Sequence, residues 1–176
     1  MLIRGRLLMK ISIILGDITK LDSDVEAIVN AANESLLGGG GVDGAIHEAA
    51  GPKLFQECLK LNGCEPGEAK VTKAYNLKQK YIIHTVGPRY YANDNPEKTL
   101  RSCYENCLKI ADKLKIKKIA FPSISTGVFA YPLDEASEIA IDVFNKYKSK
   151  NIECVFMCAF DKRTYNAYME ALSGIL

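Results

Sequence analysis

The sequence lacks long apolar runs, strong net charge and recognisable metal-binding spacings. In its 176 residues no apolar stretch approaches the roughly 20 residues of a membrane-spanning helix, so we expect no membrane partner. The net charge is only +2, and no basic stripe carries interleaved aromatic residues, which argues against a nucleic-acid partner. The hydrophobic content of 48% and charged content of 25% are those of an ordinary globular domain. The length favours one domain.

Histidine is also scarce, since the chain has only His47 and His84. The cysteines are Cys58, Cys64, Cys103, Cys107, Cys154 and Cys158. Their even number would allow disulfides, but a chain of this size buries about 70% of its unfolded surface and needs none to fold. None of the spacings is the C-x-x-C of zinc sites. We therefore expect buried, reduced thiols, no metal, no cofactor and a cytoplasmic location.

Residues 1–9 contain two arginines and several leucines, which faintly resemble a signal peptide. A long apolar core and a small-residue cleavage site do not follow them. We expect residues 1–9 to be an N-terminal extension ahead of an alternative start at Met9, and residues 10–176 to form a single domain.

Apolar strand-like runs alternate with amphipathic helical segments along the rest of the chain. The patterns predict strands at 10–15, 26–30, 69–74, 81–86, 118–122 and 152–160, and helices at 44–50, 52–61, 96–114, 134–147 and 164–172. Within 96–114, a stripe at three- and four-residue spacing predicts the core face: Leu100, Cys103, Tyr104, Cys107, Leu108, Ala111 and Leu114. This alternation predicts an α/β fold whose mixed, mostly parallel sheet is covered on both faces.

The stretch from Asn30 to His47 is the most informative part of the sequence. An apolar run delivers the amides of Asn30 and Asn33, and a glycine run, a carboxylate and a helical segment follow. The glycines are Gly38, Gly39, Gly40 and Gly41. Glycine lets backbone N–H groups approach a ligand, and the start of a helix adds unpaired N–H groups and a positive dipole end. The stretch therefore predicts an anion site, and a diphosphate is the anion that we expect there.

Each residue of this stretch also has a purely structural interpretation. Asp43 can cap a helix that begins at Gly44, the glycines can form a flexible turn, and His47 can be a satisfied, half-buried histidine. A turn needs only one or two glycines, however, and each further glycine adds backbone entropy that folding must remove. The combination favours the anion site.

A second loop of small residues, SISTGVFAYP at 123–132, follows the predicted strand 118–122. Its hydroxyl and N–H groups can hold the other side of the same anion. Asp17 follows the strand at 10–15, where ligand contacts often lie in open α/β sheets, although for this residue taken alone a turn-forming role is favoured. His84 lies inside the apolar run 81–86, which favours a structural role over a catalytic one.

Five ordered motifs make the chain resemble the macrodomain family. They are GDIT at 16–19, NAAN at 30–33, GGGGVDGAIH at 38–47, HTVGP at 84–88 and SISTGVFAYP at 123–132. Within that family they are most similar to the MacroD-type branch of O-acetyl-ADP-ribose deacetylases. The resemblance covers residues 10–172 and implies a three-layer α/β/α sandwich with one ADP-ribose cleft across the strand ends. The zinc-containing branch is not supported, because its extra cysteine and histidine ligands are absent.

The resemblance also implies roles for individual residues. Asp17 is expected to accept a hydrogen bond from the adenine amino group, with Ile18 and Phe160 lining that pocket. Asn33 and Asp43 are the implied catalytic residues, with Asn33 on the distal ribose and Asp43 beside its reactive carbon. The remaining implied substrate-binding residues are Asn30, Gly38, Gly39, Gly40, Gly41, Val42, His47, Ser125, Thr126, Gly127, Val128 and Phe129. Ala130 stands where relatives often carry glycine, and we expect its methyl group to be tolerated.

The implied reaction is hydrolysis of ADP-ribose esters, without metal or cofactor. The expected substrates and partners are ADP-ribose, O-acetyl-ADP-ribose and mono-ADP-ribosylated proteins modified on acidic side chains. Asp43 can orient or deprotonate the attacking water. Two alternatives remain: a reader module that binds ADP-ribose without cleaving it, and an ADP-ribose-1″-phosphate phosphatase.

Overall fold

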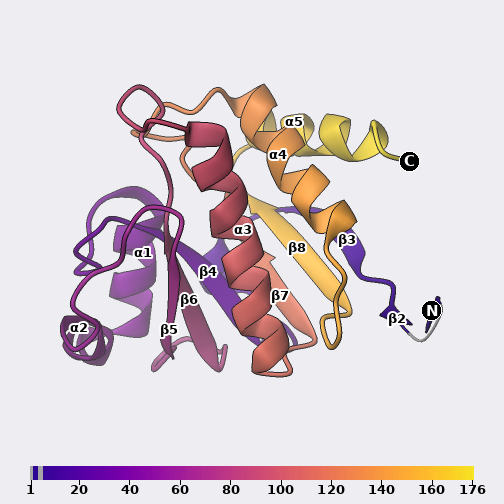
Figure 1. The fold of residues 1–176 in the computed structure, drawn as a ribbon. Coiled ribbons are helices and arrows are strands. Elements are labelled where there is room, and N and C mark those ends of the chain that lie inside the picture. The colour runs from indigo at the N-terminus through magenta and orange to yellow at the C-terminus, as the bar shows by residue number, and fades with distance from the viewer. Residues whose placement is uncertain (1, 4–5) are drawn as a thin grey trace.

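The structure, a computed structural model, describes residues 2–3 and 6–176 and is built on a six-stranded sheet (Figure 1). The strands are β3 (Lys10–Leu15), β4 (Ala27–Ala32), β5 (Ala69–Lys73), β6 (Tyr81–Val86), β7 (Lys118–Phe121) and β8 (Cys154–Ala159). Their order in the sheet is β3-β8-β7-β4-β6-β5. All neighbouring pairs are parallel except β5 with β6 at one edge. The predicted mixed, mostly parallel sheet is confirmed.

The helices lie on both faces of this sheet. They are α1 (Gly41–Ala50), α2 (Pro52–Leu59), α3 (Pro96–Lys113), α4 (Leu133–Lys146) and α5 (Lys162–Ser173), with a short 3₁₀ helix at Ile18–Lys20. α3, α4 and α5 cover one face, and α1 and α2 cover the other. The predicted three-layer α/β/α sandwich is therefore confirmed.

Alternating residues of the strands supply two separate hydrophobic cores. In β4, Val29 packs toward α3 and α4, while its neighbour Ile28 packs toward α1 and α2. Ile83 and Ile82 divide in the same way in β6. Successive side chains of a strand point to opposite faces, so a strand buried on both faces must be apolar almost throughout. This explains why these strands appear in the sequence as short continuous apolar runs.

The amphipathic stripe of α3 is buried as predicted. Six of its members are buried against the sheet: Leu100, Cys103, Tyr104, Cys107, Leu108 and Ala111. The seventh, Leu114, is half-buried, because α3 ends at Lys113. Tyr104 makes an edge-to-face contact with Phe144 of α4 at 5.4 Å between ring centroids, which joins the two helices on this face.

The ends of several predicted elements are wrong by a few residues. α2 ends at Leu59 rather than at 61, because Asn62 and Gly63 adopt left-handed backbone conformations that stop the helix. β4 continues to Ala32 rather than 30, because β6 pairs with it along its whole length. β7 stops before Pro122, which has no N–H to donate to a neighbouring strand.

The first residues are not part of the central sheet. β1 (Leu2–Ile3) and β2 (Arg6–Leu7) pair with each other in an antiparallel ribbon. Residues 1, 4 and 5 of the predicted extension 1–9 lie outside the described residues, and that boundary stays a prediction. In the described part of the chain, all six cysteines are buried with free thiols. None of the described helices combines the length and apolarity that crossing a membrane requires.

Candidate functional site

Most of the residues singled out in the sequence follow the carboxyl ends of parallel strands, whereas Asn30 and His84 lie within β4 and β6. The chain leaves β4 and returns through α1 and α2 on one face, whereas it leaves the neighbouring β7 and returns through α4 on the other face. Connections that diverge from adjacent strands in this way mark the position where open α/β sheets bind ligands. The loop after β4 and the loop after β7 therefore flank the expected binding position.

The loop after β4 leads into α1 three residues earlier than predicted. α1 begins at Gly41, not at Gly44, and Gly41 has a φ of 58° that favours glycine. Gly40 is the N-cap residue, so Asp43 lies inside the first turn and does not cap the helix. A carboxylate in a first turn is still stabilised by the helix dipole. The capping interpretation of Asp43 is wrong.

Asp43 is buried, with 4% of its surface exposed, and it meets side chains from β4 and α1. Its Oδ1 accepts a hydrogen bond of 2.8 Å from Asn30 Nδ2 and lies 3.6 Å from His47 Nε2, one helical turn further on. Burial raises the pKa of Asp43, and the hydrogen bond from Asn30 and the charge of His47 only partly offset this. A carboxylate with a raised pKa is a better proton acceptor than an exposed one.

Asn33 and Asp43 come together beneath Gly39. A Cβ atom placed on Gly39 would lie 3.2 Å from Asp43 Oδ2 and 3.3 Å from Asn33 Nδ2. Asn33 also holds the loop, because its Nδ2 donates to the carbonyl of Gly38 at 2.9 Å and its Oδ1 accepts from Ser35 N at 3.1 Å. The structure therefore places the two predicted catalytic side chains on one spot. The contact of Asn33 with a ribose stays a prediction.

Hydrogen bonds hold both ends of the loop after β7. Ser123 Oγ hydrogen-bonds to Thr126 Oγ1 at 2.7 Å and to Tyr168 of α5 at 2.8 Å. The Tyr131 N–H donates to the carbonyl of Ser125 at 2.9 Å, which closes the loop into a tight turn. Ser125 has a φ of 67°. Its side chain packs so closely on Gly87 that any side chain at position 87 would collide with Ser125.

Both loops present backbone N–H groups that the described part of the chain leaves without a hydrogen-bond acceptor. In the first loop these belong to residues 38–43, and in the second to residues 126–129. Gly40 and Gly127 have no positive φ, and a Cβ at either would meet nothing within 4 Å. Neither backbone conformation nor packing explains glycine at these two positions. Close approach of a ligand to the backbone does explain it.

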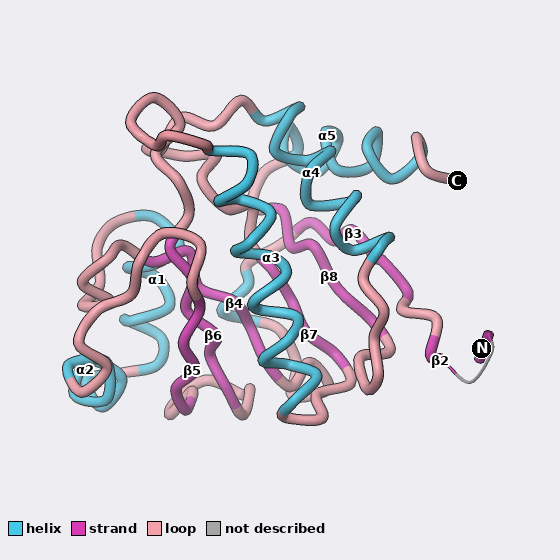
Figure 2. The backbone as a smooth tube through the Cα atoms, viewed as in Figure 1, coloured by secondary structure: helices cyan, strands magenta, loops and turns pink. Residues whose placement is uncertain are grey.

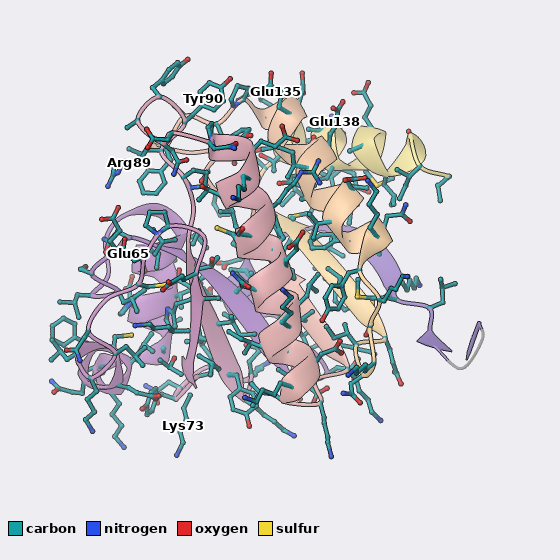
Figure 3. All side chains as sticks on the ribbon, in the orientation of Figure 1. Glu65, Lys73, Arg89, Tyr90, Glu135 and Glu138 are labelled. Atoms are coloured by element: carbon teal, nitrogen blue, oxygen red, sulfur yellow. The ribbon has the colours of Figure 1, made fainter. Side chains whose placement is uncertain are left out.

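The loop after β6 braces the second loop, a contact that was not predicted. Tyr90 N donates to the carbonyl of Phe129 at 2.9 Å, and the guanidinium of Arg89 lies 4.3 Å above the Phe129 ring. Figure 2 shows the two loops running together, and Figure 3 labels Arg89 and Tyr90 on the loop after β6. A cation over an aromatic face is a stabilising contact. In the sequence, the signal for this contact was the HTVGP motif, which ends directly before Arg89.

The predicted adenine end lies at the carboxyl ends of β3 and β8. Asp17 Oδ1 accepts hydrogen bonds from Thr19 Oγ1 at 2.6 Å and from Thr19 N at 2.9 Å, and these bonds lower its pKa. Asp17 thus caps the 3₁₀ helix, as its turn-forming interpretation predicted, and its adenine contact stays a prediction. Ile18 is buried, whereas 82% of Phe160 is exposed directly after β8. An exposed aromatic ring at a strand end is available to stack on a base.

The remaining predicted residues lie in α1, in the second loop and in β4. Val42 is half-buried in the first turn of α1, and Val128 is 96% exposed in the second loop. Asn30 is fully buried beneath Asp43, so the structure connects it to the site through that carboxylate. Its direct contact with a substrate stays a prediction.

His84 is fully buried and hydrogen-bonded on both ring nitrogens, and a catalytic contact of its own with a ligand is not among its interactions in the described part of the chain. Its connection to the site was not predicted. His84 is the register partner of Asn30 across β4 and β6, and the ring and the amide lie 3.1 Å apart. In the sequence, the signal for this contact was a polar residue, Asn30 or His84, inside each of two apolar strands.

Two further features of the described residues concern ligands. No group of three or more potential metal-binding side chains occurs among them. A surface hollow of about 500 Å³ lies between the segment 66–68, the loop 93–95 and α3. None of the predicted site residues lines this hollow, so it is separate from the loops described above.

Comparisons with known proteins give one consistent result. A family model described as "Macro domain" matches residues 29–140. A macro domain-containing protein of Chlorobaculum tepidum is 51% identical over 164 residues, which are 92% of this chain and 94% of that protein. Human "ADP-ribose glycohydrolase MACROD2" is 45% identical over 169 residues, which are 93% of this chain but 39% of that protein. A mutant Oceanobacillus iheyensis macrodomain with ADPR has a TM-score of 0.88 at 41% identity, over 93% of this chain and 91% of that one.

Proposed function

This chain belongs to the macrodomain family, in its MacroD-type branch, and from that membership we propose that it binds ADP-ribose and hydrolyses ADP-ribose esters. The observation that carries the proposal is the pair of loops at adjacent strand ends, each with unpaired N–H groups and a glycine that the protein itself does not require. Two such loops fit the two phosphates of a diphosphate. The names of the human relative and of the Oceanobacillus structure support the same ligand.

The proposed binding mode places ADP-ribose across the carboxyl ends of the sheet. The diphosphate lies between residues 38–42 and 125–129, and the adenine lies toward Asp17, Ile18 and Phe160. The distal ribose lies over Gly39, against Phe129 and the side chains of Asn33 and Asp43. This order follows the strand order, because β3 and β8 lie on one side of β7 and β4 lies on the other.

In the proposed reaction, Asp43 holds or deprotonates a water molecule beside an electrophilic carbon of the ester linkage. The water oxygen forms a bond to that carbon, the bond from carbon to the ester oxygen breaks, and the departing oxygen takes up a proton. Asp43 suits this role because burial raises its pKa while Asn30 keeps one of its oxygens fixed. Two rigid phosphate loops supply positioning, which by itself lowers the barrier substantially.

We propose O-acetyl-ADP-ribose and proteins carrying mono-ADP-ribose on acidic side chains as the substrates. Nucleic acid and membrane are not among the proposed partners, in line with the net charge of +2. Six buried cysteines with free thiols support a reducing, cytoplasmic setting.

The test is a parallel incubation with O-acetyl-ADP-ribose and with a protein mono-ADP-ribosylated on Asp or Glu, with the products identified by mass. We expect ADP-ribose from both, together with acetate or the unmodified protein. Binding of ADP-ribose in calorimetry without either product identifies a reader instead. Release of phosphate from ADP-ribose-1″-phosphate, without ester hydrolysis, identifies the phosphatase.

A further inference from the structure

A continuous series of side-chain hydrogen bonds, called the hydrogen-bond chain below, runs from β5 through β6 and β4 to Asp43. His84 Nε2 lies 2.9 Å from Thr72 Oγ1, and His84 Nδ1 lies 3.1 Å from Asn30 Nδ2. Asn30 Nδ2 also donates to Asp43 Oδ1 at 2.8 Å, and Thr72 Oγ1 donates to the carbonyl of Lys73 at 3.0 Å. Asn30, Thr72 and His84 are all buried, so water does not compete for these bonds.

Each hydrogen in this chain has one consistent position. Thr72 has a single hydroxyl hydrogen, which it donates to the Lys73 carbonyl, so Thr72 Oγ1 must accept a hydrogen bond from His84 Nε2. The neutral ring therefore carries its hydrogen on Nε2 and can only accept at Nδ1, so Asn30 Nδ2 donates its two hydrogens to His84 Nδ1 and to Asp43 Oδ1. The chain begins at a backbone carbonyl and ends at the Asp43 carboxylate.

We propose that His84 is a positioning residue for ester hydrolysis: by accepting from Asn30, it forces the Asn30 amide to present N–H, rather than C=O, to Asp43. The inference rests on the proposed function for its catalytic meaning. The opposite orientation of the amide would point Asn30 Oδ1 at two acceptors, His84 Nδ1 and Asp43 Oδ1. That orientation loses two hydrogen bonds and favours a protonated Asp43, which cannot activate water.

The charges around the chain are consistent with a neutral His84. Burial, and to a lesser extent the charge of His47, lower the pKa of His84 to about 3, so the ring stays unprotonated at neutral pH. Of the titratable groups near the chain, His47 of α1 and the Cys58 thiol of α2 lie close to Asp43. Lys70 of β5 is the register partner of His84, and its ammonium group is bonded to the carbonyls of Leu61 and Gly63.

The test measures the pKa of Asp43 by carboxyl carbon NMR in ligand-free wild type, His84→Leu and His84→Asn. Leucine removes the acceptor, whereas asparagine keeps an oxygen near the position of Nδ1. We expect His84→Leu to raise the pKa of Asp43 by about one unit or more, because a hydrogen bond to the ionised carboxylate is lost. His84→Asn should stay close to wild type. An unchanged Asp43 pKa in His84→Leu overturns the proposal.

Kinetics then separate positioning from a purely structural role. In single-turnover hydrolysis by His84→Leu, the acidic limb of the pH–rate profile should shift to higher pH together with the Asp43 pKa. The Kd for ADP-ribose should stay unchanged. A structural role alone would lower the melting temperature of both variants and leave the limb in place. If wild type hydrolyses no ester, the proposed function fails, and the NMR titration still tests the role of His84 at Asp43.

A measurement on folded wild type covers the case in which His84→Leu does not fold. Nitrogen NMR of the His84 ring should show an unprotonated Nδ1 and a protonated Nε2 throughout pH 5–8. Thr72→Val removes the acceptor of the Nε2 hydrogen and should increase the fraction protonated on Nδ1, whereas Thr72→Ser should not. A wild-type ring that is protonated on Nδ1, or that titrates in this range, overturns the proposal.

Discussion

Asp43 uses its two oxygens differently. Oδ1 accepts from Asn30, whereas Oδ2 lies on the side of Gly39, next to the amide of Asn33. The buried environment raises the pKa of Asp43, so the group combines a fixed orientation with increased basicity. One oxygen fixed by Asn30, and a second that has no hydrogen bond within the described residues, is the arrangement that an activator of water requires.

Asp43→Asn should lower single-turnover ester hydrolysis by about 10²-fold or more while ADP-ribose binding persists. Asparagine keeps an oxygen that accepts from Asn30 but loses the negative charge and the basicity. Rate and affinity are measured together, with Glu48→Gln, which removes an exposed carboxylate from the same helix, as the matched control. A wild-type rate with wild-type affinity in Asp43→Asn would leave the reader module as the better description.

Ala130→Gly should stabilise the protein by about 0.5–1 kcal/mol, which raises the Tm by a few degrees. Ala130 has a φ of 64°, a conformation that glycine adopts without the steric cost of a methyl group. The tolerance of the methyl group stays a prediction, but the positive φ strains the backbone at Ala130. Thermal unfolding checks this against Ala92→Gly, in an exposed loop without positive φ, which should be slightly destabilising. Equal losses in both variants would contradict the argument.

At the scale of elements, the second loop functions as a preformed unit. Its ends are fixed by Ser123, Tyr131 and the bracing contact from Tyr90, while the N–H groups of residues 126–129 remain unpaired. A rigid loop loses little entropy when it binds an anion, which increases affinity. Substitutions at positions of this loop that face open space should therefore affect ligand binding without affecting the fold.

Gly127→Glu should abolish ADP-ribose binding and leave the fold intact. The added side chain enters open space, so it strains nothing in the free protein, but it carries volume and negative charge into the proposed phosphate position. Gly127→Gln adds nearly the same volume without charge and should bind more weakly than wild type but better than Gly127→Glu. Calorimetry and circular dichroism give both quantities. Wild-type affinity in Gly127→Glu would mean that this loop does not hold phosphate.

At the scale of the whole molecule, Asp112 ties α3 to the segment that precedes β8. Its carboxylate accepts hydrogen bonds from Tyr147 OH at 3.0 Å and from the N–H groups of Lys150, Asn151 and Ile152 at 3.1, 2.9 and 3.2 Å. Burial raises the pKa of Asp112, but these hydrogen bonds outweigh burial and hold the pKa below its usual value. The carboxylate therefore contributes stability above the unfolded-state pKa of about 3.9.

Asp112→Asn should lower the free energy of unfolding at pH 7 by about 2–3 kcal/mol, because an amide group would face several N–H donors. The wild-type advantage should shrink as the pH falls below about 4 and disappear once Asp112 is protonated in the folded protein. Urea unfolding at pH 7 and pH 3 measures both effects. Asp161→Asn is the control, because asparagine caps a helix as well as aspartate does. A pH-independent difference would contradict the role of the charge.

The sequence alone determined the fold class, the buried stripe of α3, the strand at 81–86 and the small-residue loops. These follow from local periodicity and from the stereochemistry of single residues, which neighbours along the chain already specify. It did not determine where α1 begins, since a run of glycines carries no helix preference and the left-handed turn at Gly41 sets that end.

Only the tertiary structure decided which side chains meet. Asn30 and His84 are separated by 54 positions and touch because β4 and β6 pair in register. Asn33 and Asp43 converge because the Gly39 backbone passes over both of them. The brace from Arg89 and Tyr90 to Phe129 joins loops that follow different strands. Sheet pairing and chain crossing create such contacts, and a linear pattern of residue types does not encode them because each contact depends on two distant segments at once.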